Sequence, residues 1–218
     1  MSGTDAPGRA APGEGAAPLV EALVRPAVPA GGRPVGLDDV LPRPEHVTRQ
    51  ARWIPAPPAV VWEALHETRL SMLPVTLALG AARFLPVVLA GRGFGLLHDR
   101  PFLDALPVPL LVSDPPSSLL FGGALQAWRP SGGDRGPRLD AEGLRSFTQR
   151  GWVKAAMDFR LTPRGSGTEL SSETRVASTD AETRRRFDRY WRLVRPGSSA
   201  IRWEVLTAVE LKATGRLY

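Results

Sequence analysis

The sequence predicts an α+β protein with an antiparallel sheet and a long helix at the C-terminal end. Two segments within residues 152–178 alternate apolar and polar positions on either side of a Gly-containing turn, which is typical of a β-hairpin. Apolar residues then recur at helical spacing towards the end of the chain. The 218 residues suffice for one sizeable domain with a tail. A content of 43% hydrophobic and 23% charged residues is ordinary for a globular protein.

Residues 1–40 are predicted to form a disordered tail, and residues 41–218 a single domain. Residues 1–36 contain 8 Ala, 6 Pro and 7 Gly and no aromatic residue. Such a segment buries too little apolar surface to offset the entropy that is lost when the chain becomes ordered. The sequence does not open with the basic and apolar regions of a signal peptide, so we expect a cytoplasmic location.

A strand followed by a helix is expected at the start of the domain. Residues 46–54 alternate between two sets of side chains, which suits a strand. The prolines between residues 55 and 58 stop this strand, and proline is favoured in the first turn of a helix. We therefore predict a helix over residues 59–65.

The apolar segment 72–90 has the length of a membrane span. Arg83 lies near its middle, and an arginine at the centre of a bilayer costs about 2.5–3.5 kcal/mol. Pro74, Gly80 and Pro86 also interrupt the segment. We therefore expect two short helices that cover a core after the first strand, rather than a transmembrane helix.

Further strands are expected at residues 107–113 and 118–128, and the clearest signal is the hairpin that follows them. Residues 152–161 and 169–178 each alternate with period two, and residues 162–168 between them are suited to a turn.

The register of this hairpin follows from its apolar faces. If Leu161 faces Leu170, the apolar side chains of both strands share one face of the sheet. Asp158 then lies near Arg175 on the outer face. We expect charged groups there to form a solvated surface network in which each pair contributes little to stability.

A long helix is predicted to close the chain. Residues 179–182 have the form of a capping box. The aromatic residues Phe187, Tyr190 and Trp191 begin an apolar stripe at helical spacing. The Pro-Gly pair at residues 196–197 is expected to break or kink the helix before it continues.

Six arginines lie on this helix between residues 184 and 195, in a chain of formal net charge +6. A solvated helix face is the first interpretation, and contact with an anionic membrane is an alternative. Binding to nucleic acid needs a basic face placed on phosphates. No nucleic-acid-reading motif accompanies the helix, and its apolar face is committed to the core, so we expect no nucleic-acid partner.

Several function classes are disfavoured by residues that are missing from the sequence. The absence of cysteine removes disulfides, thiolate metal sites and cysteine nucleophiles. The three histidines (His46, His66 and His98) are far apart, so no metal site is expected. The Gly-rich residues 91–95 lack the strand and helix context of a phosphate loop, and Gly-x-Ser-x-Gly is absent. We therefore expect neither a cofactor nor a metal.

The order of the elements resembles the SRPBCC superfamily, which includes START lipid-binding domains, aromatase/cyclases and relatives of the birch-pollen allergen. The resemblance spans about residues 44–215 and is strongest, towards actinobacterial members, over residues 147–212. The stretches that carry it are Gly167-Thr-Glu-Leu-Ser-Ser-Glu-Thr-Arg-Val176, Phe187-Asp-Arg-Tyr-Trp191 and Arg195-Pro-Gly-Ser198 with Ile201-Arg202. It implies a helix-grip fold, in which a curved antiparallel sheet wraps around the C-terminal helix and encloses an apolar cavity.

Within such a fold, the sequence predicts non-catalytic binding or carriage of a hydrophobic small molecule such as a lipid, a polyketide or an isoprenoid. Burial of the ligand's apolar surface would drive binding, and a few polar groups would orient it. The side chains expected to line the cavity are those of Met157, Phe159, Ser172, Thr174 and Trp191. A cyclase or dehydratase that acts on a ligand in the same cavity is the alternative, although no residue is nominated as its acid or base. A domain with a solid core is the third interpretation.

Overall fold

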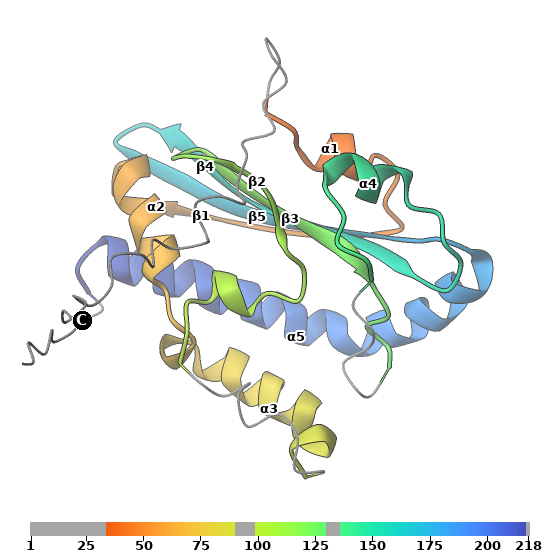
Figure 1. Cartoon of the computed structure of the whole chain (residues 1–218). Coiled ribbons are helices and arrows are strands. Elements are labelled where there is room, and N and C mark those ends of the chain that lie inside the picture. Colours follow the sequence, from red (N-terminus) through yellow and green to blue (C-terminus); the bar gives the residue numbers. More distant parts are fainter. Residues whose placement is uncertain (1–33, 90–98, 130–135, 217–218) are drawn as a thin grey trace, which may run out of the picture.

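The computed structural model describes residues 34–89, 99–129 and 136–216, with side chains omitted for residues 84–89. Its centre is a five-stranded antiparallel sheet with the strand order β1-β5-β4-β3-β2 (Figure 1). The strands are β1 (His46–Ile54), β2 (Leu110–Asp114), β3 (Ser118–Leu125), β4 (Val153–Arg164) and β5 (Gly167–Ser178).

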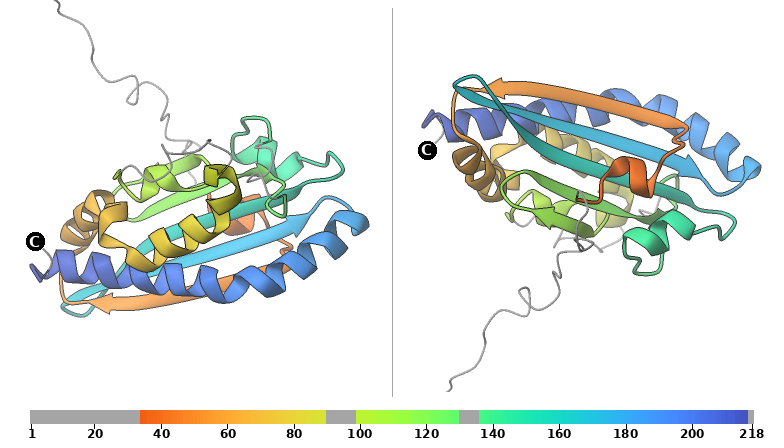
Figure 2. Two further views of the ribbon diagram at one scale, coloured as in Figure 1. Left: turned by 90° about the horizontal axis from the view of Figure 1, so that it is seen from below. Right: turned by 90° about the horizontal axis from the view of Figure 1, so that it is seen from above.

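Helices cover both faces of this sheet. They are α1 (Leu37–Val40), α2 (Pro58–Glu67), α3 (Pro74–Leu89), α4 (Ala141–Ser146) and α5 (Ala181–Ala213), with short 3₁₀ turns η1 (Leu70–Met72) and η3 (Leu103–Ala105). The long helix α5 crosses one face along β1 and β5 with α3 beside it, and α1 and α4 lie on the opposite face (Figure 2). This arrangement of a curved antiparallel sheet around a C-terminal helix is a helix-grip fold, as the sequence predicts.

The predicted first strand and the hairpin are confirmed. Residues 46–54 form β1, and α2 begins at Pro58. Proline is favoured there because the amide of a first-turn residue has no hydrogen-bond acceptor within the helix. In the hairpin, Leu161 lies opposite Leu170. The main core therefore lies between the interior face of the sheet, defined here as the face towards α5, and the helices α2 and α5. Its most buried side chains include Ile54, Leu65, Phe159, Leu170 and Val209.

The outer face of the hairpin differs from the expected solvated surface. Asp158 lies opposite Glu173 and is only 4% exposed. Its carboxylate accepts hydrogen bonds from Arg160 Nε at 2.6 Å and from the Glu173 amide at 3.0 Å. Arg175 binds Glu173 and Asp38 instead of Asp158. Burial beneath α1 and its neighbours is the reason for the difference, and it raises the pKa of Asp158.

The helix that covers this face comes from the end of the predicted tail. Leu37 and Val40 of α1 and the adjacent Leu41 are each no more than 2% exposed, and they form a second core with Leu120 and Leu144. The structure therefore departs from the predicted boundary at residue 40. Three closely spaced large apolar residues bury enough surface to hold α1 on the sheet. Residues 1–33 of the predicted tail lie outside the described residues.

Helix α3 is one continuous helix where two short ones are expected. Pro74 lies in its first turn, and Gly80 does not interrupt it. The carboxylate of Glu204 in α5 accepts hydrogen bonds from the amides of Val75 and Thr76 at 2.6 and 2.8 Å, which satisfies donors that a helix N-terminus leaves free. Among the described residues, no helix combines the length and apolar character that crossing a bilayer requires.

Helix α5 has a different N-cap from the predicted one, and of the two effects predicted for the Pro-Gly pair the break does not occur. Its N-cap is Asp180 rather than Thr179, since the Asp180 carboxylate accepts hydrogen bonds from the amides of Glu182 and Thr183. Pro196 does not end the helix, which runs for 33 residues from Ala181 to Ala213. Its packing along the sheet overrides the local cost of an interior proline.

Candidate functional site

In the middle of the sheet, the interior face is apolar on β3 and β4 and polar on β5 and β1. The register places the side chains of this face in rows that run across the strands from β3 to β1. One row contains Phe121, Met157, Thr174 and Thr48, and the next contains Leu119, Phe159, Ser172 and Gln50. Each row thus passes from apolar residues on β3 and β4 to polar residues on β5 and β1.

Helix α5 adds an arginine above the polar side of these rows. Arg202 is 5% exposed. Its Nη1 donates to Thr174 Oγ1 at 2.7 Å, and its Nη2 donates to Thr48 Oγ1 at 2.5 Å and to Ser198 Oγ at 3.1 Å. We refer to the side chains of Thr48, Gln50, Ser172, Thr174, Ser198 and Arg202 as the interior polar cluster.

Three buried atoms of the interior polar cluster have no hydrogen-bond partner in the described part of the chain. They are Arg202 Nε, Ser172 Oγ and Gln50 Oε1. The amide nitrogen of Gln50 is engaged, since it donates to the carbonyl of Ser199 at 3.1 Å. Buried polar atoms are nearly always paired in folded proteins, so these three atoms, two in one row and one on α5 above it, are positions where water or another molecule can supply the partner.

The charge of Arg202 also lacks compensation within the described residues. Its hydrogen-bond acceptors are three hydroxyl groups, and no described carboxylate forms an ion pair with it. By contrast Arg52, two positions beyond Gln50 on β1, forms an ion pair with Glu210 and donates to Thr207 Oγ1 at 3.0 Å. Burial lowers the pKa of Arg202 to about 10, so the guanidinium remains charged at neutral pH.

Solvent reaches part of the interior face. Met157 and Ala155 lie on the central strand β4 with their side chains towards α5, yet both remain partly exposed. Thr174 on β5 and Ile201 on α5 are also partly exposed. Leu119, Phe121 and Phe159 are buried, so Met157 is the apolar residue of the two rows that solvent reaches, and it lies directly opposite Thr174 of the interior polar cluster.

Four of the five predicted lining residues lie together in the two rows. Phe159 is 2% exposed and packs edge-on against Phe102 and Phe121, so it belongs to the core that supports the rows. Met157, Ser172 and Thr174 lie around it on the interior face.

Trp191 lies apart from the other four. It precedes Arg202 by eleven positions, about 16 Å along α5 at 1.5 Å per residue. It stacks on Phe187 and lies 5.3 Å from the ring of His46. The Nε2 atom of His46 in turn lies 2.8 Å from the Asp188 carboxylate.

Arg202, Thr48, Gln50 and Ser198 are not among the lining residues predicted from the sequence. One local signal was available for Arg202, because residues 202, 205, 206 and 209 have the spacing of one helix face and the other three are apolar. Likewise Thr48 and Gln50 share the alternation of β1 with the buried Ile54. Their proximity to Ser172 and Thr174 depends on the pairing of β1 with β5, which no local pattern shows.

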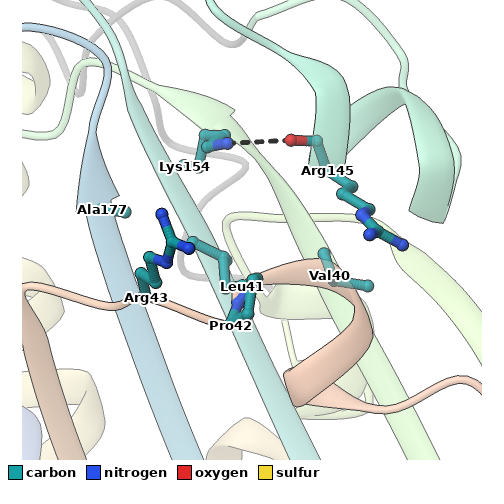
Figure 3. A pocket seen from close by; sticks show the side chains of 7 residues that line it. All are labelled: Val40, Leu41, Pro42, Arg43, Arg145, Lys154 and Ala177. Atoms are coloured by element: carbon teal, nitrogen blue, oxygen red, sulfur yellow. Dashed lines mark hydrogen bonds between the residues drawn. The ribbon is translucent and has the colours of Figure 1, made fainter.

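Two surface hollows lie away from this interior. One, of about 380 Å³, lies on the outer face and is shown in Figure 3. It is lined by Val40, Leu41, Pro42, Arg43, Arg145, Lys154 and Ala177. In it, Lys154 Nζ donates to the carbonyl of Arg145 at 3.0 Å, and burial lowers the pKa of Lys154. The other, of about 320 Å³, lies beside the N-terminus of α5 and includes Gln126, Trp128 and Asp180.

Comparison with known proteins yields likenesses of low similarity. No family model matches the chain, and no curated protein matches it significantly. Among solved structures, TTHA0849 from Thermus thermophilus is 13% identical with a TM-score of 0.33 and covers 78% of this chain and 98% of its own. Ara h 8.0201 is 11% identical with a TM-score of 0.32, again over 78% and 98%. CV1439 from Chromobacterium violaceum is 14% identical with a TM-score of 0.32, over 75% and 96%. The assignment of the fold rests on the architecture of the chain itself.

Proposed function

We propose that this protein is a divergent member of the SRPBCC superfamily that binds a hydrophobic small molecule, without chemistry, between the interior face of the sheet and α5. The observation that carries the proposal is the set of three unpaired buried polar atoms in the interior polar cluster, directly beside partly exposed apolar side chains. The polar end of an amphipathic ligand would supply hydrogen-bond partners to these atoms, and its apolar body would cover the apolar side chains.

The apolar and polar sides would have different roles in binding. Contact with Met157 and Phe121 would bury the ligand's apolar surface, which contributes about 25 cal/mol per Å². Ser172 and Thr174 would orient its polar end through hydrogen bonds. Trp191 would contact only a ligand long enough to reach the aromatic cluster near His46.

A cyclase or dehydratase needs a general acid or base within reach of its substrate. The interior polar cluster offers hydroxyl groups, an amide and a guanidinium that stays protonated at neutral pH, and these bind and orient rather than exchange protons. The composition of the cluster therefore favours binding over catalysis.

The exposed side of α5 supports a further part of the proposal, which is transient contact with an anionic membrane. Arg185, Arg189, Arg192 and Arg195 are exposed, and Leu193 among them is 81% exposed. Basic side chains attract anionic headgroups, and a leucine adds apolar contact with the bilayer. Such contact would place the protein where hydrophobic molecules are exchanged.

The ligand-binding proposal is tested with Met157→Trp and a neutral apolar fluorescent probe, N-phenylnaphthylamine. If a ligand space exists beside Met157, the larger side chain enters it, so the melting temperature stays equal or rises while probe binding falls. Val47→Trp is the control, because Val47 is 49% exposed on the outer side of β1.

A close-packed interior would give the opposite result. Overpacking would then destabilise Met157→Trp by about 1–3 kcal/mol, and the parent protein would bind no probe. Native mass spectrometry of protein purified from its own host provides an independent readout, since a bound ligand adds its own mass.

A further inference from the structure

We propose that the ligand is an amphipathic monocarboxylate whose carboxylate binds Arg202 and whose hydrocarbon chain lies along the β3–β4 side of the interior face. This inference rests on the proposed binding function and specifies the chemical class of the ligand.

A buried arginine is costly unless a negative charge compensates it, and truncation studies of buried ion pairs show how strongly an unpaired buried charge destabilises a fold. Arg202 is 5% exposed and no described carboxylate pairs with it. A single unit of negative charge on the ligand would compensate this site without leaving an excess of either sign.

The interior polar cluster has hydrogen-bond donors to spare. The Nε of Arg202 has no partner among the described residues. The hydroxyls of Thr48, Thr174 and Ser198 each accept a hydrogen bond from Arg202, so each retains its own proton for donation. The cluster therefore presents one charged donor and several hydroxyl donors in a small volume, which matches the two acceptor oxygens of a carboxylate.

The rows of the interior face give the direction of the hydrocarbon chain. Thr174, which binds Arg202, is the neighbour of Met157 in the same row, and Ser172 is the neighbour of Phe159 in the next. A carboxylate bound at Arg202 therefore has its alkyl chain adjacent to Met157 and then to Phe121 on β3. The polar residues on β1 and β5 would therefore face the carboxylate of a fatty acid, and the apolar residues on β4 and β3 would face its hydrocarbon chain.

The experiment compares dodecanoate with dodecanol, two ligands of equal chain length that differ in charge. Each is titrated against bound N-phenylnaphthylamine in the full-length parent, Arg202→Met, Arg202→Lys and Arg192→Met. We expect the parent to bind dodecanoate about ten- to a hundredfold more tightly than dodecanol, as is typical of a charge-assisted hydrogen-bonded contact.

The variants distinguish recognition of the carboxylate by Arg202 from attraction of the anion by the positive charge of the protein as a whole. Arg202→Met should lose the preference for dodecanoate over dodecanol, and Arg202→Lys should retain part of the preference. Arg192→Met is the matched control, because Arg192 is exposed on the same helix and the variant loses the same charge. It should keep the full preference.

Each result decides between the two proposals. Equal affinity of the parent for both ligands, or an undiminished preference in Arg202→Met, would overturn the carboxylate inference and leave the binding function standing. Binding of neither ligand nor probe by the parent would overturn both. If Arg202→Met fails to fold, the parent and Arg202→Lys still decide the inference, because the ratio of the two affinities is read in each protein separately.

Discussion

Arg202 and Arg52 both lie between β1 and α5, and they differ in what surrounds their charge. Arg52 forms an ion pair with Glu210, whereas hydroxyl groups alone accept hydrogen bonds from Arg202 in the described structure. The same residue type should therefore stabilise the ligand-free fold at position 52 and destabilise it at position 202.

Substitution of these two arginines by methionine should have opposite effects on the ligand-free protein. Arg202→Met removes an uncompensated buried charge, so its free energy of unfolding should equal or exceed that of the parent. Arg52→Met leaves Glu210 without its partner and should lower the free energy of unfolding by about 1 kcal/mol. Urea denaturation measures both, and a clear loss of stability in Arg202→Met would show that its three hydroxyl contacts outweigh its burial.

The contributions of Asp158 and Asp180 to the free energy of unfolding should change in opposite directions with pH. Burial raises the pKa of Asp158 above 3.8, so ionisation above that pH costs the folded state stability. Hydrogen bonds from the backbones of Thr183 and Gly151 lower the pKa of Asp180, so its ionisation contributes stability that is lost as the pH falls below about 4.

The corresponding asparagine variants reveal these contributions when each is compared with the parent. As the pH rises from 3.5 towards about 6.5, Asp158→Asn should gain stability relative to the parent, and Asp180→Asn should lose it. Denaturant midpoints at four or five pH values suffice. If the stability of both variants relative to the parent changed in the same direction with pH, the environments assigned to Asp158 and Asp180 would be wrong.

At the scale of the element, α5 contains a glycine that the helix does not require. A Cβ added at Gly197 would lie 3.4 Å from Leu79 Cδ1 of α3, which is ordinary van der Waals contact. Glycine within a helix costs about 0.8–1.0 kcal/mol relative to alanine. Gly197→Ala should therefore raise the free energy of unfolding by about 1 kcal/mol, measured by thermal and urea denaturation. A lower melting temperature would mean that α3 has to move away from α5.

Helix α1 is small, but its apolar side chains are as buried as those of the main core. Leu37→Ala should lower the free energy of unfolding by about 2–5 kcal/mol, because Leu37 is 2% exposed. Val47→Ala on the exposed side of β1 is the control and should change it little. Similar small losses in both variants would show that α1 does not contribute to the stability of the domain.

The strands β1, β4 and β5 and the helix α5 could be predicted from the sequence, whereas α1, α4 and most contacts between elements could not. Period two is enough to locate β1 and the hairpin, and the pairing of Leu161 with Leu170 follows from matching apolar faces. Local patterns do not reveal which element covers a face, so α1 above Asp158 is unforeseen. The interior polar cluster depends on β1 lying beside β5, which joins residues far apart in sequence.

For the whole molecule, the formal net charge of +6 and the basic side of α5 make surface binding sensitive to salt. The protein should bind vesicles that contain phosphatidylglycerol at low ionic strength, and binding should disappear on pure phosphatidylcholine or at about 0.5 M salt. A cosedimentation assay measures this.

Paired substitutions test whether α5 carries this contact. Arg192→Gln with Arg195→Gln should weaken vesicle binding more than Arg138→Gln with Arg216→Gln, which removes two exposed arginines elsewhere. Equal losses in the two double variants would indicate attraction by net charge alone.

The order of the strands in the sheet also dictates when the molecule can fold. His46 on β1 pairs with Val176 on β5, a separation of 176 − 46 = 130 residues. Contacts of such long range form late, because a large loop has to close before they contribute. During synthesis β1 leaves the ribosome long before β5, its neighbour in the described sheet, exists, and its exposed edge is open to incorrect pairing until then. The interior polar cluster, shared by β1, β5 and α5, is thus among the last parts of the protein to assemble.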